Sequence, residues 1–204
     1  MTAARHGLVL LAAGASRRLG TPKQLLCLDG ETLIHRAARL ALATAPHDAL
    51  VVLGHAAGAV GAALADLPVR HVHCRDWQGG LGASLATGLA ALEAACSGAL
   101  VVLCDQPGLT AAHLAALVAA WHARPEGAAA SGYAGAAGVP AMLPRAWFAA
   151  LDAGGDRGAR DLLRARQSEI VIVPDDGLAA DIDQGPDAVR LGLRPSEGSA
   201  GRRP

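Results

Sequence analysis

Apolar and polar residues follow two patterns along the first half of the chain. Continuous apolar runs with the length and β-branched content of strands span 7–12, 49–53, 69–74 and 99–104. Between these runs, leucine and alanine recur with a helical period from 33, from 81 and after Thr110, a candidate N-cap. Strands that are apolar on both faces are typical of parallel sheets covered by helices on each side. The pattern therefore predicts an α/β protein with an open, mostly parallel sheet.

The second half of the chain is less regular. The sequence predicts two short strands, two helical segments and a further strand, over 128–134, 139–143, 145–151, 157–166 and 170–173 respectively. Neither an internal repeat nor a low-complexity linker is visible. We therefore expect one domain over 1–193, followed by a frayed tail over 194–204 in which Pro, Ser, Gly and Arg leave almost nothing to bury.

Composition narrows the classes of function. Lys and Arg together number 18, as do Asp and Glu, so the chain lacks the electrostatic footprint of a nucleic-acid or membrane-surface binder. Aromatic residues make up only 2% of the sequence, which argues against a platform for stacking single-stranded bases. The four cysteines are scattered without a C-x-x-C pair, and the first apolar run is too short to span a membrane. We therefore expect a cytoplasmic protein without disulfides.

The segment after the first strand has the residues for a phosphate site, and open α/β sheets bind ligands at the carboxyl ends of their strands. Five small residues follow one another there: Ala12, Ala13, Gly14, Ala15 and Ser16. They let the backbone approach a ligand, and their N–H groups can hold phosphate oxygens. Arg18 and Lys23 add positive charge beside this loop, whose spacing fits neither the dinucleotide fingerprint nor the Walker A motif. The alternative is a tight strand–helix turn with solvated basic residues.

Two other strand ends carry candidate chemistry. After the third apolar run, Gly79 and Gly80 leave room for a flat base, and Ser84 offers a hydroxyl in the first turn of a helix. Asp105 follows the fourth run, and a carboxylate fixed there suits Mg²⁺, which prefers one or two carboxylates together with phosphate oxygens and water. The structural alternatives are a glycine loop with a capping serine, and an aspartate that starts a turn.

These segments resemble a known family. The pattern L-A-A-G-x-S-x-R-x-G-x-x-K-x-L-L over 11–26 is similar to the signature of nucleotidyltransferases related to the molybdenum-cofactor guanylyl- and cytidylyltransferases, with Leu19 in place of the usual methionine. The segments 77–89 and 103–107 resemble two further motifs of that family. The resemblance implies a Rossmann-like, three-layer sheet of the nucleotide-diphospho-sugar transferase type. It also implies transfer of a nucleoside monophosphate from an NTP with release of pyrophosphate, a pyrimidine read by 77–89, and Mg²⁺ bound by Asp105.

Three later segments extend the resemblance. The segments 138–144 and 155–163 are similar to the motifs G-x-P-x-L/F-x-P and G-D-x-G-A-R-x-L-L of the cytidylyltransferase branch. Arg157 and Arg160 are candidates to hold an acidic pterin phosphate; the alternative is that they are solvated or paired with neighbouring carboxylates. The D-I-D at 181–183 matches the family's terminal motif but lacks the Thr-Pro-Glu-Asp that usually follows. Asp183 is the candidate for a second metal-binding carboxylate.

Other polar residues are weaker candidates. His71 and His73 share a strand face without a third ligand of matching spacing, and Cys27 and Cys104 have no base paired with them in the sequence pattern. We expect packing or surface roles for all four.

Together the matches predict a Mg²⁺-dependent enzyme that transfers CMP from CTP to a molybdopterin-type cofactor, with Arg18, Lys23 and Asp105 as catalytic residues. CTP is favoured over GTP because guanylyltransferases of this family tend to read L-A-G-G, whereas the methyl group of Ala13 narrows the approach of a purine. The alternatives are a guanylyltransferase, a sugar-phosphate nucleotidylyltransferase and a non-catalytic cofactor-binding chaperone. A molybdoenzyme or its maturation chaperone is the candidate protein partner.

Overall fold

The computed structural model describes residues 4–16, 19–151, 158–179, 187, 189 and 191–195. Three of the candidate site residues, Arg18, Arg157 and Asp183, lie outside the described residues.

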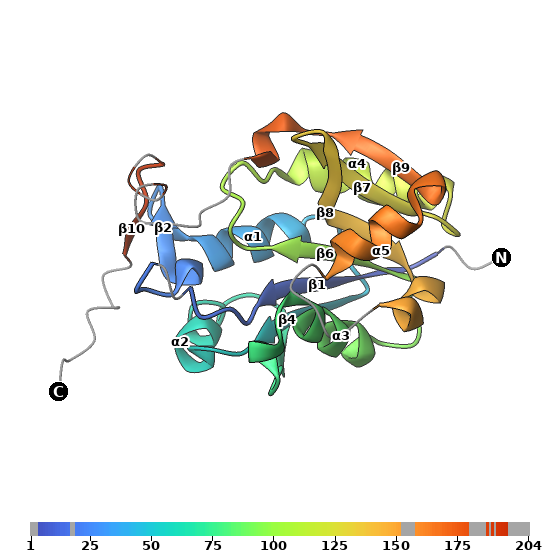
Figure 1. Cartoon of the computed structure of the whole chain (residues 1–204). Coiled ribbons are helices and arrows are strands. Elements are labelled where there is room, and N and C mark those ends of the chain that lie inside the picture. The colour runs from blue at the N-terminus through green and yellow to red at the C-terminus, as the bar shows by residue number, and fades with distance from the viewer. Residues whose placement is uncertain are drawn as a thin grey trace.

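A seven-stranded sheet runs through the centre of the molecule (Figure 1). Its order is β5 (Arg70–His73), β4 (Asp48–Leu53), β1 (His6–Ala12), β6 (Gly98–Leu103), β8 (Ala136–Pro144), β7 (Ala128–Tyr133) and β9 (Ile170–Pro174). The β1–β4, β1–β6, β4–β5 and β7–β9 pairs are parallel, and β8 is antiparallel to both β6 and β7. The sheet is therefore mostly parallel, with one reversed strand.

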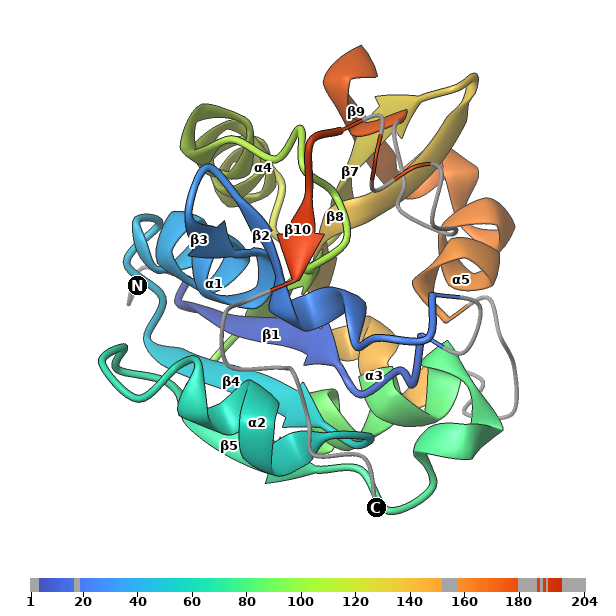
Figure 2. The ribbon, with the colours of Figure 1, turned by 90° about the vertical axis from the view of Figure 1, so that its left-hand side faces the viewer.

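Helices cover both faces of this sheet (Figure 2). On one face lie α1 (Leu33–Leu42), α2 (Ala57–Ala62) and α4 (Ala111–Ala123), and on the other lie α3 (Leu81–Ala91) and α5 (Ala159–Ala165). Each face has its own apolar core. Along β1, Leu8 and Leu10 belong to the α1/α4 core, whereas Val9 and Leu11 belong to the α3/α5 core. This burial on two sides explains why the strands are apolar at every position.

Threonine side chains cap two of the helices. The Thr32 hydroxyl accepts a hydrogen bond from the backbone N–H of His35 at 3.4 Å, and the Thr110 hydroxyl accepts one from His113 at 3.2 Å. Each cap satisfies an N–H group that has no partner within its helix. The predicted N-cap at Thr110 is therefore confirmed.

The predicted fold class is confirmed. The four strands expected in the first half each begin within one residue of the predicted position. In the second half, the helical segment expected over 145–151 is a 3-10 helix, η3 (Arg145–Ala150), and β8 begins at Ala136 rather than at 139.

Several short elements were not predicted, among them α2 and a small second sheet. In that sheet, β2 (Leu26–Leu28) pairs antiparallel with β3 (Glu31–Thr32) and with β10 (Arg194–Pro195). The first two residues of the expected tail are thus paired rather than frayed. The remaining 3-10 helices are η1 (Lys23–Leu25), η2 (Trp77–Gly79), η4 (Gln167–Glu169) and η5 (Asp176–Ala179). In the described part of the chain, no helix is long and apolar enough to cross a membrane.

Candidate active site

Lys23 and Asp105 form an ion pair at the carboxyl edge of the sheet. Leu11 of β1 lies opposite Leu103 of β6 in a parallel ladder, so both strands end at the same edge of the sheet (Figure 1). Nζ of Lys23, in η1, donates a hydrogen bond to Oδ2 of Asp105. The two side chains are 22% and 14% exposed, so the pair is partly shielded from water but open to a ligand.

The other carboxylate oxygen of Asp105, Oδ1, is buried and has no hydrogen-bond partner among the described residues. Burying a polar atom without a hydrogen-bond partner costs free energy. At the ligand-binding edge of the sheet, such an atom indicates a binding site for a ligand or metal ion. Such an oxygen fits Mg²⁺, which takes one or two carboxylates alongside phosphate oxygens and water. No group of three or more His, Cys, Asp or Glu side chains is placed to hold a metal within the described ranges, and Asp183 lies outside them.

Gln24 shapes the loop after β1, a role that the sequence analysis missed. Its side chain is 1% exposed, and its Nε2 donates to the carbonyl oxygen of Ala12 at 2.9 Å and to that of Gly14 at 2.7 Å. One amide group therefore holds two loop carbonyls. The pattern of hydrophobic and polar residues cannot identify a side chain that acts by binding backbone carbonyl oxygens. The only sequence signal for this role is that Gln24 directly follows the motif residue Lys23.

A second hydrogen bond fastens the far end of the same loop. The backbone N–H of Lys23 donates to Oγ of Ser16 at 3.0 Å, and Ser16 has a left-handed backbone with φ of 50°. Gly14 is exposed and Ser16 is half-buried, whereas Ala12 and Ala13 are buried. Of the five small residues, those at 14–16 are therefore the ones open to a ligand.

The segment expected to read the base lies beside this loop. The backbone N–H of His55, after β4, donates to the carbonyl oxygen of Ala13 at 3.0 Å. The His55 ring in turn contacts Trp77, with ring centroids 5.4 Å apart. Trp77 begins η2, which ends at Gly79, and Gly80 is the N-cap of α3, which begins at Leu81. Gly80 has φ of 96°, a conformation that is essentially restricted to glycine.

The three predicted base-site residues differ in exposure. Gly79 is exposed and Gly80 is half-buried, whereas Ser84 is only 4% exposed. The backbone of the two glycines is therefore more open to a ligand than the Ser84 hydroxyl.

Gln106 joins the Asp105 segment to β8. Its side chain is 3% exposed, and its Nε2 donates to the carbonyl oxygen of Val139 at 3.0 Å and to the hydroxyl oxygen of Tyr133 at 3.4 Å. The Tyr133 hydroxyl donates to the same Val139 carbonyl at 2.9 Å. These bonds hold the 138–144 motif next to the candidate metal ligand.

The backbone of η5 also lies against the Asp105 segment. A Cβ atom added to Gly108 would lie 2.1 Å from the carbonyl oxygen of Gly177, so the two backbones are in direct contact. The described chain thus reaches the Asp105 segment shortly before the D-I-D motif at 181–183.

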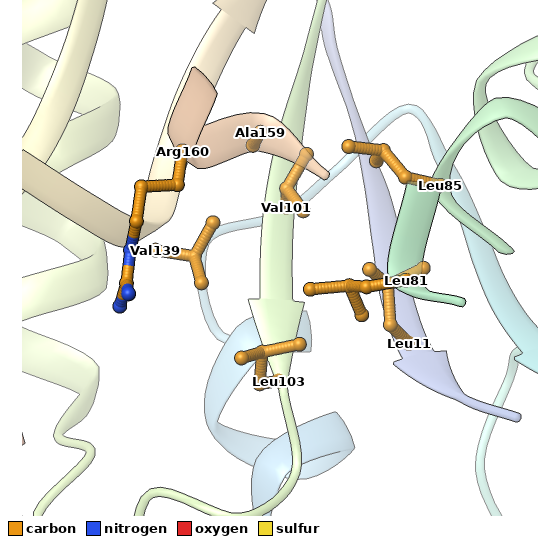
Figure 3. Close-up of a pocket in the computed structure, with 8 residues that line it drawn as sticks. All are labelled: Leu11, Leu81, Leu85, Val101, Leu103, Val139, Ala159 and Arg160. Carbon is orange, nitrogen blue, oxygen red and sulfur yellow. The ribbon is translucent and has the colours of Figure 1, made fainter. Parts of the chain in front are cut away.

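A cavity of about 110 Å³ lies on the α3/α5 side of the sheet (Figure 3). Its lining comes from β1, α3, β6, β8 and α5 and consists of Leu11, Leu81, Leu85, Val101, Leu103, Val139, Ala159 and Arg160. Arg160, one of the predicted cofactor-binding residues, is the only charged residue of the lining among the described residues. Its side chain extends along the Val139 side of the cavity, in the direction in which β6 runs (Figure 3).

His71, His73 and Cys104, which were noted in the sequence, do not supply a nucleophile to the candidate site. His71 and His73 are exposed on β5, the edge strand of the sheet. Burial raises the pKa of the Cys104 thiol to about 12, and the neighbouring Asp105 carboxylate adds to the shift. Cys104 therefore stays protonated at neutral pH and is a poor nucleophile.

A serine, a histidine and an aspartate meet under α4. Nε2 of His113 lies 2.7 Å from Oγ of Ser131, and Nδ1 of His113 lies 3.4 Å from a carboxylate oxygen of Asp175. Ser131 is fully buried, and its hydroxyl donates to the carbonyl oxygen of Pro140 at 2.6 Å. A nucleophile must reach its substrate, so we assign this chain of contacts to the packing of α4 against β7 and β8.

Known proteins are similar to this chain over most of its length. Residues 8–170 match the model of the MobA-like NTP transferase domain. The chain is 36% identical over 188 residues to nicotine blue oxidoreductase of Paenarthrobacter nicotinovorans. The alignment covers 86% of this chain and 90% of that protein. The chain is 35% identical over 188 residues to purine catabolism protein PucB of Bacillus subtilis (strain 168), with the same coverage of both chains.

A solved structure agrees with these matches. Rv0371c from Mycobacterium tuberculosis H37Rv has a TM-score of 0.80 and 31% sequence identity, covering 93% of this chain and 98% of that one. The same mycobacterial protein solved as a complex with manganese has a TM-score of 0.79 and 29% identity, with the same coverage. The chain therefore belongs to the MobA-like NTP transferase family and is a nucleotidyltransferase.

Proposed function

We propose that this nucleotidyltransferase transfers the CMP moiety of CTP to an anionic group of a molybdopterin-type cofactor, in a Mg²⁺-dependent reaction that releases pyrophosphate. The observation that carries the proposal is the Lys23–Asp105 pair. A cation and a carboxylate with a buried, unpartnered oxygen meet beside a loop of small residues at the ligand-binding edge of the sheet. A cofactor-binding chaperone has no need of such a pair, because binding alone requires no activating metal.

The residues of the chain supply charge and position. In the proposed step, an oxygen of the acceptor anion attacks the α-phosphorus and forms a new P–O bond. The bond from that phosphorus to the oxygen bridging the α- and β-phosphates breaks, and pyrophosphate leaves with the electron pair. Lys23 and Arg18 neutralise the triphosphate and the charge that develops on it, while the loop fastened by Gln24 positions it. The acceptor anion carries no proton to remove, so the step requires no general base.

Asp105 and Asp183 are the residues proposed to hold Mg²⁺, which when bound supplies positive charge to the phosphate oxygens. The unpartnered Oδ1 of Asp105 supports its part in this site. The manganese complex of Rv0371c supports a divalent metal ion in a related protein.

Ala13, Gly79, Gly80 and Ser84 are the residues proposed to surround the base. The backbone bond from His55 to Ala13 and the contact of His55 with Trp77 support this grouping, because they hold the first loop and the 77–84 segment together. Ala13 is 3% exposed and packs in the α3/α5 core, so we propose that its methyl group favours a pyrimidine over a purine by setting the path of the loop that follows it, not by touching the base.

Arg160 and Arg157 are the residues proposed to bind the acceptor, and a molybdoenzyme or its maturation chaperone is the proposed recipient of the product. Arg160 lines the same cavity as Leu11 and Leu103, which supports its proposed role in binding the acceptor. Both leucines lie in the strands that lead to the Lys23–Asp105 pair.

The proposal is tested by incubating purified protein with molybdopterin-type cofactor, MgCl₂ and either CTP or GTP, with chromatography of the products. We expect a cytidylylated cofactor and pyrophosphate in equal amounts, with both lost on addition of EDTA and restored by excess MgCl₂. A greater yield from GTP would overturn the choice of base. Turnover with glucose 1-phosphate but not with the cofactor would overturn the choice of acceptor, and pyrophosphate release that persists in EDTA would overturn the metal requirement.

A further inference from the structure

The order of the strands at the carboxyl edge of the sheet matches the order of the parts of a nucleotide. β6, β1, β4 and β5 are consecutive neighbours, and β1, β4 and β5 can be followed across the sheet in Figure 2. The residues proposed to hold the triphosphate and the metal ion follow β1 and β6, whereas the segment proposed to read the base follows β5. The ribose of a nucleotide lies between its phosphates and its base. The turn that follows β4 therefore lies at the place where the ribose of the proposed nucleotide would be.

Gly54 and His55 form this turn and contact the segments on both sides of it. The backbone N–H of His55 donates to the carbonyl oxygen of Ala13 at 3.0 Å. A Cβ atom added to Gly54 would lie 2.7 Å from that same oxygen and 2.7 Å from Cβ of Trp77. The backbone of the turn is therefore packed between the loop after β1 and the start of the 77–84 segment.

The imidazole ring of His55 is open to a ligand. His55 is exposed, and within the described part of the chain its ring nitrogens take part in no hydrogen bond or ion pair. Its ring contacts Trp77, with centroids 5.4 Å apart and the planes at 52°, and this contact restrains its orientation. A neutral imidazole has one donor and one acceptor nitrogen, and a hydroxyl group both donates and accepts. The ring can therefore bind a hydroxyl group in either tautomer.

We infer that the imidazole of His55 binds a ribose hydroxyl of the nucleotide substrate. The inference rests on the proposed function, because it places the nucleotide between the Lys23–Asp105 pair and the 77–84 segment. It adds a residue that selects ribonucleotides over deoxyribonucleotides, whichever base and acceptor the enzyme uses.

A purely structural role for His55 would not need its ring nitrogens. The bond to Ala13 comes from the backbone, and the contact with Trp77 is one that a phenyl ring can also make. His55→Phe therefore removes the proposed hydrogen bond to the ribose and keeps both structural contacts.

Calorimetric titration of the full-length protein with CTP, 2′-deoxy-CTP and 3′-deoxy-CTP tests the inference, in MgCl₂ and without an acceptor, so that only binding is measured. At least one deoxy analogue should bind wild type about tenfold more weakly than CTP, because one hydrogen bond to the hydroxyl is lost. His55→Phe should bind CTP and that analogue equally, both with the affinity that wild type has for the analogue. GTP and its deoxy analogues take the place of the cytidine nucleotides if wild type prefers GTP.

His122→Phe is the matched control. His122 is exposed and contacts the Trp121 ring, with centroids 5.2 Å apart. It lies near His6, at the start of β1 and thus at the opposite edge of the sheet from the candidate site. The preference for CTP over the analogue should be unchanged in this variant.

Equal affinities of wild type for all three nucleotides would overturn the inference. So would a preference for CTP that persists in folded His55→Phe. An equal loss of affinity for CTP and both analogues, with the preference retained, would assign His55 to structure alone. Circular dichroism reports folding, and His55→Ala, which adds no bulk, should lose the same preference if the Phe variant fails to fold.

Failure of this inference is distinguishable from failure of the proposed function. If CTP is turned over with the cofactor but the preference survives in folded His55→Phe, the function stands and the ribose contact falls. If the preference depends on His55 but no acceptor releases pyrophosphate, the ribose contact stands and the proposed transfer falls.

Discussion

Lys23 and Asp105 form an ion pair although 82 residues separate them in the sequence. The parallel pairing of β1 with β6 brings them together, because it places the ends of both strands at one edge of the sheet. At that edge the amine meets one carboxylate oxygen and leaves the other buried without a partner among the described residues. The pair thus combines a positive charge suited to the proposed triphosphate with a negative charge suited to the proposed metal ion.

Gln24→Met should raise KM for CTP by about tenfold, because the loop proposed to position the triphosphate loses both hydrogen bonds from Nε2. The free energy of unfolding should also fall by about 1–3 kcal/mol, since two carbonyl groups lose a buried donor. Initial-rate kinetics and denaturant unfolding measure the two effects. Gln167→Met is the matched control, because Gln167 is exposed in η4. A fall in stability with an unchanged KM would show that Gln24 serves folding alone.

Gly80→Ala should lower the free energy of unfolding by about 1–3 kcal/mol, because φ of 96° is a backbone conformation that alanine adopts only under strain. Gly79→Ala is the control: its added Cβ would meet only the Cβ of Ala83, at 3.5 Å, which is an ordinary contact. Its effect should stay within about 0.5 kcal/mol. Urea unfolding of both variants makes the comparison, and equal losses would contradict the assignment of strain to Gly80.

Stability should depend on pH through His6, which is buried at the start of β1. Burial, with a contribution from His122, lowers the pKa of His6 to about 4. Between pH 6.5 and 4 the unfolded chain therefore binds a proton that the folded chain does not. The free energy of unfolding should fall by on the order of 3 kcal/mol as the pH drops through this range.

The His6→Asn variant tests whether His6 causes this dependence of the free energy of unfolding on pH, which is measured as the slope between pH 6.5 and 4. Glu31, whose pKa is lowered to about 2 mainly by its hydrogen bond from Arg39, acts in a separate range below pH 4.5. Burial also lowers the pKa of His113, so part of the slope should remain in the variant. Denaturant unfolding at several pH values measures it, and an unchanged slope in His6→Asn would refute the role of His6.

Ala13→Gly should shift the choice of base. Removing this buried methyl group should let the 14–16 loop move away from the 77–84 segment and make room for a purine, so turnover with GTP should rise several-fold relative to turnover with CTP. The ratio of kcat/KM values for the two nucleotides reports the change. Wild-type protein that already prefers GTP would contradict the role given to Ala13.

Most of the fold could be predicted from the sequence, because the central strands are apolar on both faces. β1, β4 and β6 are almost continuous apolar runs, and such runs are typical of strands in parallel sheets that are buried on both faces. α2 could not be predicted in this way. Of its six residues, AGAVGA, only Val60 is buried, and a single buried side chain cannot show the 3.6-residue spacing of an amphipathic helix. β2, β3 and β10 are two or three residues long, and their pairing depends on tertiary context.

The site residues that belong to sequence motifs could be predicted. The residues that act through hydrogen bonds to distant backbone groups could not. Lys23 and Asp105 follow predicted parallel strands, so the sequence places both at the carboxyl edge of the sheet. The pairing of β1 with β6, which puts them side by side, was not predicted. Gln24 and Gln106 act through carbonyl oxygens of distant segments, which no spacing in the sequence encodes. The apolar cavity is likewise a property of packing between five elements.

The most direct test of the central claim is pyrophosphate release from CTP in the presence of Mg²⁺ and cofactor, by wild-type protein, Lys23→Ala and Asp105→Ala. Each variant should turn over slower than wild type by roughly two or more orders of magnitude, because an electrostatic stabiliser of the reacting phosphates is lost. Circular dichroism should show that both remain folded. Near-normal rates in either folded variant would contradict the assignment of the active site to this pair.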